Sequence, residues 1–104
     1  MITRFWHGRT KSSDAVQYRQ YVMETGIRDL VATPGNVGAQ IWQHPEGAIT
    51  HIWVVSWWKD RESIQAFAGK EIDIARYYED DKNYLLEFEP TLINCEAYDF
   101  KTSS

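Results

Sequence analysis

The sequence contains a single cysteine, Cys95, among 104 residues, so no disulfide can form within the chain. It shows neither a signal peptide nor a long apolar run that could cross a membrane. A cytoplasmic location is therefore expected, and a membrane is not an expected partner. The histidines are isolated, and no Cys/His pair has the spacing of metal ligands, so we expect no metal site.

Basic residues are also few, with 11 lysines and arginines against 15 acidic residues and a net charge of −4. Because the lysines and arginines form no cluster, nucleic acid and anionic membranes are poor partners. No catalytic triad, phosphate-binding loop or dinucleotide fingerprint can be read. The sequence therefore predicts no cofactor, and any oxygen chemistry would need an activated substrate such as a phenolate.

The sequence is rich in large aromatic residues. Hydrophobic residues make up 43% of the chain, and five residues are tryptophan, which is more than one small core needs. Two explanations stay open: the aromatic side chains line a ligand cavity, or they complete a dimer interface. The length suits one domain over residues 1–100, followed by a frayed tail at 101–104.

The clearest local pattern is a strand that leads directly into a helix, over residues 50–69. Residues 51–58 are β-branched and aromatic, which favours a strand. Apolar residues then recur at helical spacing. Asp60 is placed to cap this helix, and Gly69 is placed to end it. Trp58 therefore closes the strand beside a helix N-terminus, where ligand sites are common.

The other helices and strands are predicted from the spacing of apolar residues and from turn-forming residues. We expect a long helix with a kink or break near Thr25-Gly26, a turn at residues 33–36, and a hairpin between the second and third strands. The predicted strands span residues 2–9, 37–44, 49–58 and 91–100, and the predicted helices span 15–32, 60–69 and 72–77, with a loop at 79–81.

The order β-α-β-β-α-β predicts an α+β, ferredoxin-like fold with an antiparallel four-stranded sheet. Two helices can cover only one face of that sheet. The other face would expose Trp, Val and Ile from strands of period two, which is a liability for a lone chain. A second copy packed on this face would remove the liability. We therefore expect a homodimer in which two sheets form a barrel.

Short stretches spread over nearly the whole chain carry a family resemblance. They are Phe5-Trp6-His7-Gly8, Thr25-Gly26, Ala32-Thr33-Pro34-Gly35-Asn36, Trp58 with Asp60 and Ser63, Ala66-Phe67-Ala68-Gly69, Ala75-Arg76-Tyr77-Tyr78, and Leu85-Leu86-Glu87 with Glu89-Pro90-Thr91. Together they resemble the antibiotic biosynthesis monooxygenase (ABM) domain family, whose fold is the dimeric α/β barrel. Trp58, at the junction of strand and helix, is the commonest mark of that family.

The resemblance implies two kinds of chemistry. Cofactor-free members oxidise phenols or hydroquinones with molecular oxygen, and they place an Asn four residues before the junction Trp and a Tyr six residues after it. Those positions are Val54 and Ile64 here. Haem-degrading members carry a Trp and a haem-ligating His at positions that correspond to Phe67 and the neighbourhood of Tyr78. Only Trp58 matches, so haem binding or degradation is the weaker implication.

Alternation along the third strand separates two surfaces. Val54, Ser56 and Trp58 share one side, which the resemblance places toward the helices and a cavity. Trp53 and Trp57 share the other side and would meet the partner subunit. A cavity and an interface are thus expected on opposite faces of one sheet.

Three residues are candidates for catalysis, each with a plainer alternative. Trp58 either packs the helix on the sheet or stacks on a flat aromatic ligand. His7 acts as a base or is a hydrogen-bonded structural residue. Tyr78, or its neighbour Tyr77, could bind a phenolic substrate or its anion. The remaining expected pocket residues are Phe5, Val54, Phe67, Tyr77 and Asn94, the last standing where relatives of this branch often carry a His.

Two functions remain open at this point. One is a cofactor-independent monooxygenase that oxidises a quinol or polycyclic phenol with O₂. The alternative is a non-catalytic dimer that binds a small aromatic ligand. Conversion of a bound phenol would favour the first, and saturable binding without product would favour the second.

Overall fold

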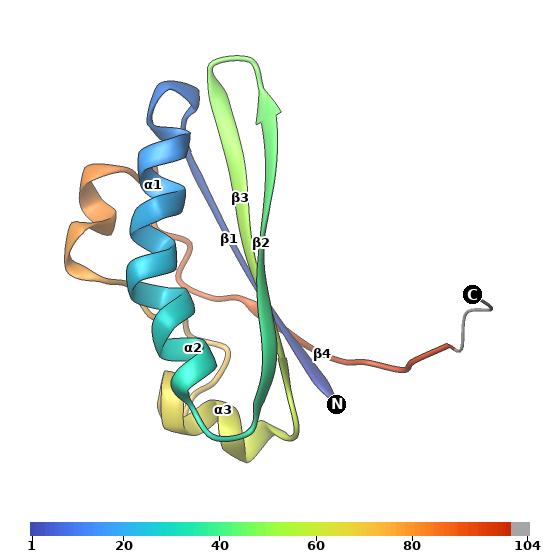
Figure 1. Ribbon diagram of the computed structural model, residues 1–104. Helices are drawn as coiled ribbons and strands as arrows, with labels where there is room; N and C mark the ends of the chain where they lie inside the picture. The colour runs from blue at the N-terminus through green and yellow to red at the C-terminus, as the bar shows by residue number, and fades with distance from the viewer. Residues whose placement is uncertain (101–104) are drawn as a thin grey trace.

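The computed structural model describes residues 1–100, which form a four-stranded antiparallel sheet with helices against one face (Figure 1). The tail expected at 101–104 lies outside the described residues. The strands lie across the sheet in the order β2-β3-β1-β4. This is the ferredoxin-like arrangement that the order of elements predicted. The strands are β1 (Ile2–Lys11), β2 (Asn36–Glu46), β3 (Ile49–Trp58) and β4 (Ile93–Glu96).

The centre of the sheet is the pairing of β1 with β3, which runs from Ile2 opposite Trp58 to Lys11 opposite Ile49. Alternate residues of β3 point to opposite faces. Ile52 and Trp58 are fully buried on the helix side. The predicted alternation of the third strand is therefore confirmed.

The first helical segment changes its geometry where the apolar period slips. It consists of α1 (Ala15–Val22), a π-helical turn η2 (Met23–Ile27) and α2 (Arg28–Ala32). The π turn takes up an extra residue and shifts the buried face of the helix. As a result Tyr18 and Val22 before the turn and Leu30 after it all reach the core. The sequence thus located the irregularity near Thr25-Gly26 correctly, and it is a π turn within a continuous helix.

Turn and cap residues fix the connections as expected. Gly35, in the turn after α2, has a φ of 92°, a region that favours glycine. The hairpin between β2 and β3 turns at Gly47-Ala48. The carboxylate of Asp60 accepts the Ser63 N–H at 2.8 Å and caps α3 (Arg61–Ala68).

Two predictions for the segment after α3 are wrong. Residues 72–77 are not helical, and residues 79–81 belong to a 3₁₀ helix, η3 (Glu79–Asn83). The Ala75 N–H donates to the Pro90 carbonyl, and the Leu92 N–H donates to the Asp73 carbonyl. This pairing between distant segments gives the backbone the partners that a local helix would have supplied. The last strand is correspondingly short and pairs with β1 only over Ile93–Glu96.

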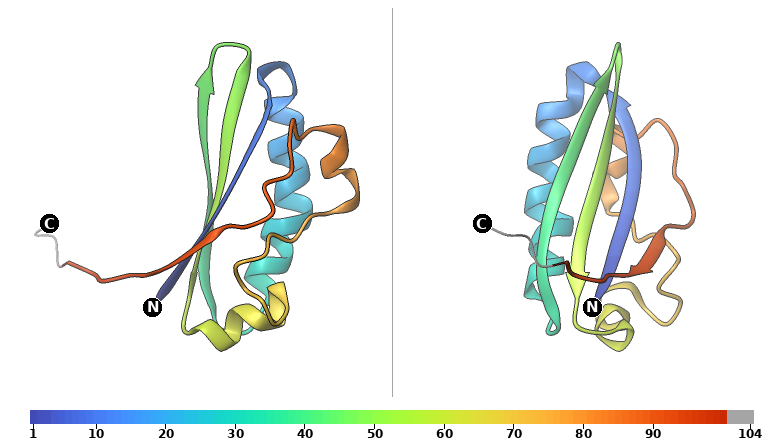
Figure 2. Two further views of the ribbon diagram at one scale, coloured as in Figure 1. Left: turned by 180° about the vertical axis from the view of Figure 1, so that it is seen from behind. Right: turned by 90° about the vertical axis from the view of Figure 1, so that its right-hand side faces the viewer.

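The second face of the sheet carries no helix, as the right-hand view of Figure 2 shows. Trp42 is 44% exposed and Ile93 is 60% exposed, and their partners in register, Trp53 and Phe5, place them on this face. We call it the uncovered face. Among residues 1–100, no helix is long and apolar enough to cross a membrane.

Candidate active site

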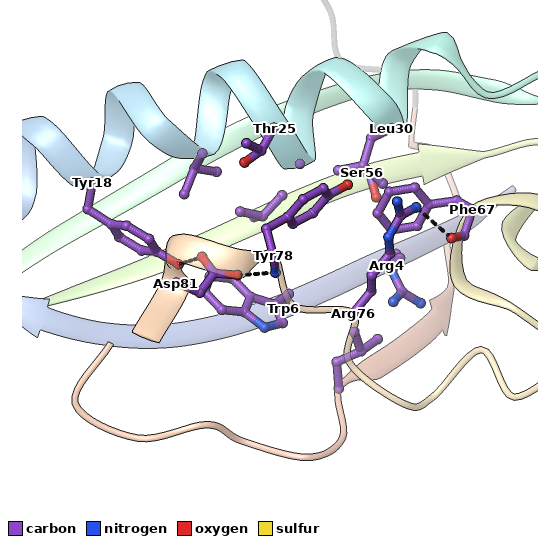
Figure 3. Close-up of a pocket in the computed structure, with 14 residues that line it drawn as sticks. Arg4, Trp6, Tyr18, Thr25, Leu30, Ser56, Phe67, Arg76, Tyr78 and Asp81 are labelled. Atoms are coloured by element: carbon purple, nitrogen blue, oxygen red, sulfur yellow. Dashed lines mark hydrogen bonds between the residues drawn. The ribbon is translucent and has the colours of Figure 1, made fainter. Parts of the chain in front are cut away.

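A cavity lies between the sheet and the first helical segment (Figure 3). About 60 Å³ of it is open to the centres of water-sized molecules. One water needs roughly 10–15 Å³ by this measure, so the cavity has room for about one aromatic ring. Its apolar wall is formed by Trp6, Val22, Leu30, Val54, Phe67 and Leu92.

Asp81 supplies a carboxylate at one end of this cavity. The residue is only 5% exposed. Its Oδ1 accepts the Tyr18 hydroxyl at 2.9 Å, and its Oδ2 accepts the Tyr78 N–H at 2.6 Å. Burial raises the pKa of Asp81, and it outweighs the lowering effect of the two hydrogen bonds. This end of the cavity therefore holds a carboxylate with increased proton affinity.

Tyr78 lies in the middle of the cavity (Figure 3). Its hydroxyl donates to Asp29 Oδ2 at 2.6 Å. This bond lowers the pKa of Asp29, while burial, together with the bond, raises the pKa of Tyr78. A Cβ added at Gly26 would meet the Tyr78 ring at 3.8 Å. The π turn and α2 thus hold the ring in position.

Two arginines and Phe67 form the opposite end (Figure 3). The guanidinium carbons of Arg4 and Arg76 lie 5.7 Å and 4.8 Å from the Phe67 ring centroid. Arg76 Nη1 donates to the Phe67 carbonyl at 2.9 Å, and its Nη2 lies 3.5 Å from an Asp29 carboxylate oxygen. Arg4 is 3% exposed, and its Nη1 donates to the Ile72 carbonyl at 2.5 Å.

The structure brings Val54, Phe67 and Tyr78 of the predicted residues into this cavity. Trp58 is fully buried beside it. Its Nε1 donates to Ser56 Oγ at 2.8 Å, and its ring lies 6.3 Å from that of Phe67. Since Ser56 and Phe67 both line the cavity, Trp58 supports the wall from behind.

Tyr77 and Asn94 are not among the residues that line the cavity. The Tyr77 hydroxyl donates to the Glu89 carbonyl at 2.5 Å. Asn94 stands opposite Arg4 in the sheet, and its Nδ2 donates to the Ile72 carbonyl at 3.1 Å. Both side chains hold the irregular segment between α3 and β4 in place.

Phe5 and His7 lie on the uncovered face, so the structure does not bring them to the cavity. Both pair in register with residues of that face of β3, Val55 and Trp53. His7 Nδ1 lies 2.5 Å from Glu89 Oε2, and His7 Nε2 lies 2.9 Å from His51 Nδ1. If His7 acts as a base, it does so on the uncovered face and not in the cavity. That role stays a prediction.

Sequence reasoning did not single out three polar residues of the cavity: Arg4, Tyr18 and Asp81. The sequence does contain a pattern that could have identified Arg4. It stands between Ile2 and Trp6 on the inward face of a strand, where a charged residue is unusual. Tyr18 follows the helical period and reads as core. Asp81 belongs to an acidic run that reads as solvated surface, and no local pattern marks it.

No family model and no curated protein matches the chain. Among solved structures, it is similar to a candidate antibiotic biosynthesis monooxygenase from Nitrosomonas europaea, with a TM-score of 0.65, 13% identity, and coverage of 93% of this chain and 98% of the other. It is also similar to the haem degrader MhuD from Mycobacterium tuberculosis, solved with two haems in its active site, with a TM-score of 0.60, 16% identity, and coverage of 97% and 100%. The chain therefore has the same fold as these two proteins.

Proposed function

We propose that the protein binds a small phenolic ligand in this cavity and oxidises it with molecular oxygen, as a cofactor-independent monooxygenase. Of the quinols and polycyclic phenols that the sequence leaves open, the size of the cavity favours a single-ring quinol. The observation that carries the proposal is the Asp81 carboxylate, buried at the end of an aromatic cavity with a raised pKa. A carboxylate of raised proton affinity in an apolar site is suited to take the proton of a phenol. A single-ring quinol fits the cavity as it stands.

The chemistry requires little more than deprotonation and orientation. The ligand hydroxyl transfers its proton to the Asp81 carboxylate. The phenolate that results passes one electron to O₂. The ring carbon then bonds to one oxygen atom and loses its hydrogen as a carbonyl forms, and the second oxygen atom leaves as water. The walls formed by Trp6, Phe67 and Tyr78 hold the ring flat and exclude water.

An oxygen electrode with a panel of single-ring hydroquinones and phenols tests this proposal. We expect protein-dependent oxygen uptake that falls about 100-fold or more in Asp81→Asn, because positioned acid–base groups contribute at least that factor. Asp80→Asn, at the exposed neighbouring position, should retain the uptake. No uptake with any phenol, or equal uptake in Asp81→Asn, would contradict the proposal.

A non-catalytic binder is the second candidate, and one observation favours it. Val54 and Ile64 occupy the positions at which the oxygenase pattern places Asn and Tyr. Val54 lines the cavity and Ile64 is fully buried, so neither supplies a polar group there. Recovery of a bound phenol unchanged in air would support this candidate.

Haem does not fit these residues. The cavity has room for about one aromatic ring, and the positions that correspond to the Trp and the ligating His of haem degraders are Phe67 and the neighbourhood of Tyr78, whose hydroxyl is already bonded to Asp29.

We also propose that the uncovered face is the interface of a homodimer. Its support is the exposed apolar surface of Trp42, Ile93 and their neighbours. Residues 97–100 extend away from the sheet on this side, in red in Figure 1, and Tyr98 and Phe100 are 77% and 89% exposed. A second copy would cover the face and these side chains. The cytoplasmic location stays a prediction from the sequence.

A further inference from the structure

Arg4 is the one strongly buried charge of the cavity that the proposed chemistry does not use. Arg4 is 3% exposed. Within residues 1–100, its side chain makes one hydrogen bond, from Nη1 to the Ile72 carbonyl. A guanidinium has five N–H donors. No carboxylate of the described chain lies within 4.0 Å of it, and Asp73 acts on it only from farther away. Burial lowers the pKa of Arg4 to about 10, which reflects the unfavourable burial of its charge.

The second arginine of the cavity is different, because its charge already has a partner. Arg76 lies 3.5 Å from Asp29 and is only partly buried. The single carboxylate of Asp29 also accepts the Tyr78 hydroxyl. Two guanidinium groups thus line one end of the cavity, and the Asp29 carboxylate pairs with that of Arg76. The charge of Arg4 is the one left without a counter-ion.

We propose that the cavity takes an aromatic acid, whose carboxylate is bound by Arg4 while its ring lies between Phe67 and Trp6 and its hydroxyl points toward Asp81. The inference rests on the proposed function, because it names the ligand class of the same cavity. A guanidinium binds a carboxylate through two parallel hydrogen bonds, which suits a site with several free donors. The two charged ends of the cavity then give a hydroxylated aromatic acid one orientation (Figure 3).

The alternative to ligand binding is a purely structural role, in which Arg4 only holds the segment around Ile72. Asn94 also donates to the Ile72 carbonyl, so this segment keeps an anchor when Arg4 is replaced. Replacing a buried, unpaired charge with an apolar side chain of similar length removes the desolvation cost of that charge. Arg4→Met should therefore fold.

Anaerobic calorimetric titration of the full chain with 2,5-dihydroxybenzoate and its neutral isostere 2,5-dihydroxybenzamide tests the inference. We expect wild type to bind the acid about 10-fold more tightly than the amide or better, since hydrogen bonds to charged groups are worth that factor or more. Arg4→Met should bind both with equal affinity, and Arg4→Lys should keep part of the preference. Arg61→Met, the same change at an exposed position on α3, should keep all of it.

The contrary outcomes of this titration bear on different claims. Equal binding of acid and amide by wild type overturns the inference and leaves the proposed function standing, whether or not the variants fold. A preference for the acid that survives in Arg4→Met also overturns the inference alone. Failure of wild type to bind either compound overturns both the inference and the use of this cavity for phenolic ligands.

Discussion

Asp81 is the residue on which the acidic end of the cavity depends. It satisfies two buried donors at once, the hydroxyl of Tyr18 and the N–H of Tyr78. We predict that Asp81→Ala lowers the free energy of unfolding by about 2–4 kcal/mol, because two donors lose their acceptor. Urea denaturation measures this, with Asp80→Ala as the exposed control. An equal effect of the two substitutions would show that the Asp81 bonds do not stabilise the fold.

The ionisation of Asp81 has a separate, pH-dependent effect. Burial raises its pKa above the value of 3.8 expected in the unfolded chain. A raised pKa means that the neutral acid favours the fold: this contribution is complete below about pH 3.8 and is lost as the pH rises through the raised value. Compared with Asp81→Asn, wild type should therefore lose stability from about pH 4 upward. Urea midpoints at a series of pH values measure the difference, and a difference independent of pH would refute the assignment.

Asp29 should show the opposite dependence. The Tyr78 hydroxyl, followed by Arg28 and Arg76, lowers its pKa below 3.8. Its carboxylate therefore stabilises the fold above that pH, and the contribution is lost as the pH falls through the lowered value. The same midpoints for Asp29→Asn should differ from wild type at neutral pH and converge with it in acid. Divergence in acid would mean that the Tyr78 bond does not act on Asp29.

At the scale of single elements, the π turn connects helix geometry to the cavity. Gly26 lies in this turn, and the only atom that an added Cβ would meet is in the Tyr78 ring, at 3.8 Å. We predict that Gly26→Ala raises the free energy of unfolding by about 0.4–1 kcal/mol, because it restricts the unfolded chain. The same methyl group narrows the cavity, so affinity for a phenolic ligand should fall.

Gly35→Ala is the matched comparison for that variant. Gly35 has a φ of 92°, and a Cβ there would clash with the Ser63 side chain. Thermal melts should show stabilisation for Gly26→Ala and destabilisation for Gly35→Ala. Destabilisation of both would mean that the π turn does not tolerate a side chain at Gly26.

The elements differ in how far the sequence predicts them. The junction at Trp58, the Asp60 cap and the helix irregularity all depend on neighbours within a few residues, and they were predictable. The segment at 72–77 was not, because its backbone pairs with residues around Pro90 and Leu92. The same limit applies to the cavity: Asp81 acts on Tyr18, 63 positions away in the chain, and no local period carries that information.

At the scale of the whole molecule, the proposed interface on the uncovered face leads to a prediction of the oligomeric state. We predict a native mass of about twice 12.2 kDa by light scattering. Trp53→Glu should give the monomer mass, because a charge would be placed at the centre of the buried face. Val16→Glu, at a 67% exposed position on α1, should stay dimeric. A monomeric wild type at micromolar concentration would overturn the proposed interface.

A crystal structure of the protein grown with 2,5-dihydroxybenzoate would show whether the cavity between sheet and helices is the functional site. We expect electron density for the ligand between Trp6 and Phe67, with the carboxylate within hydrogen-bond distance of Arg4 and a hydroxyl near Asp81. A cavity that remains empty, or a ligand bound on the uncovered face beside His7 and Trp53, would contradict it.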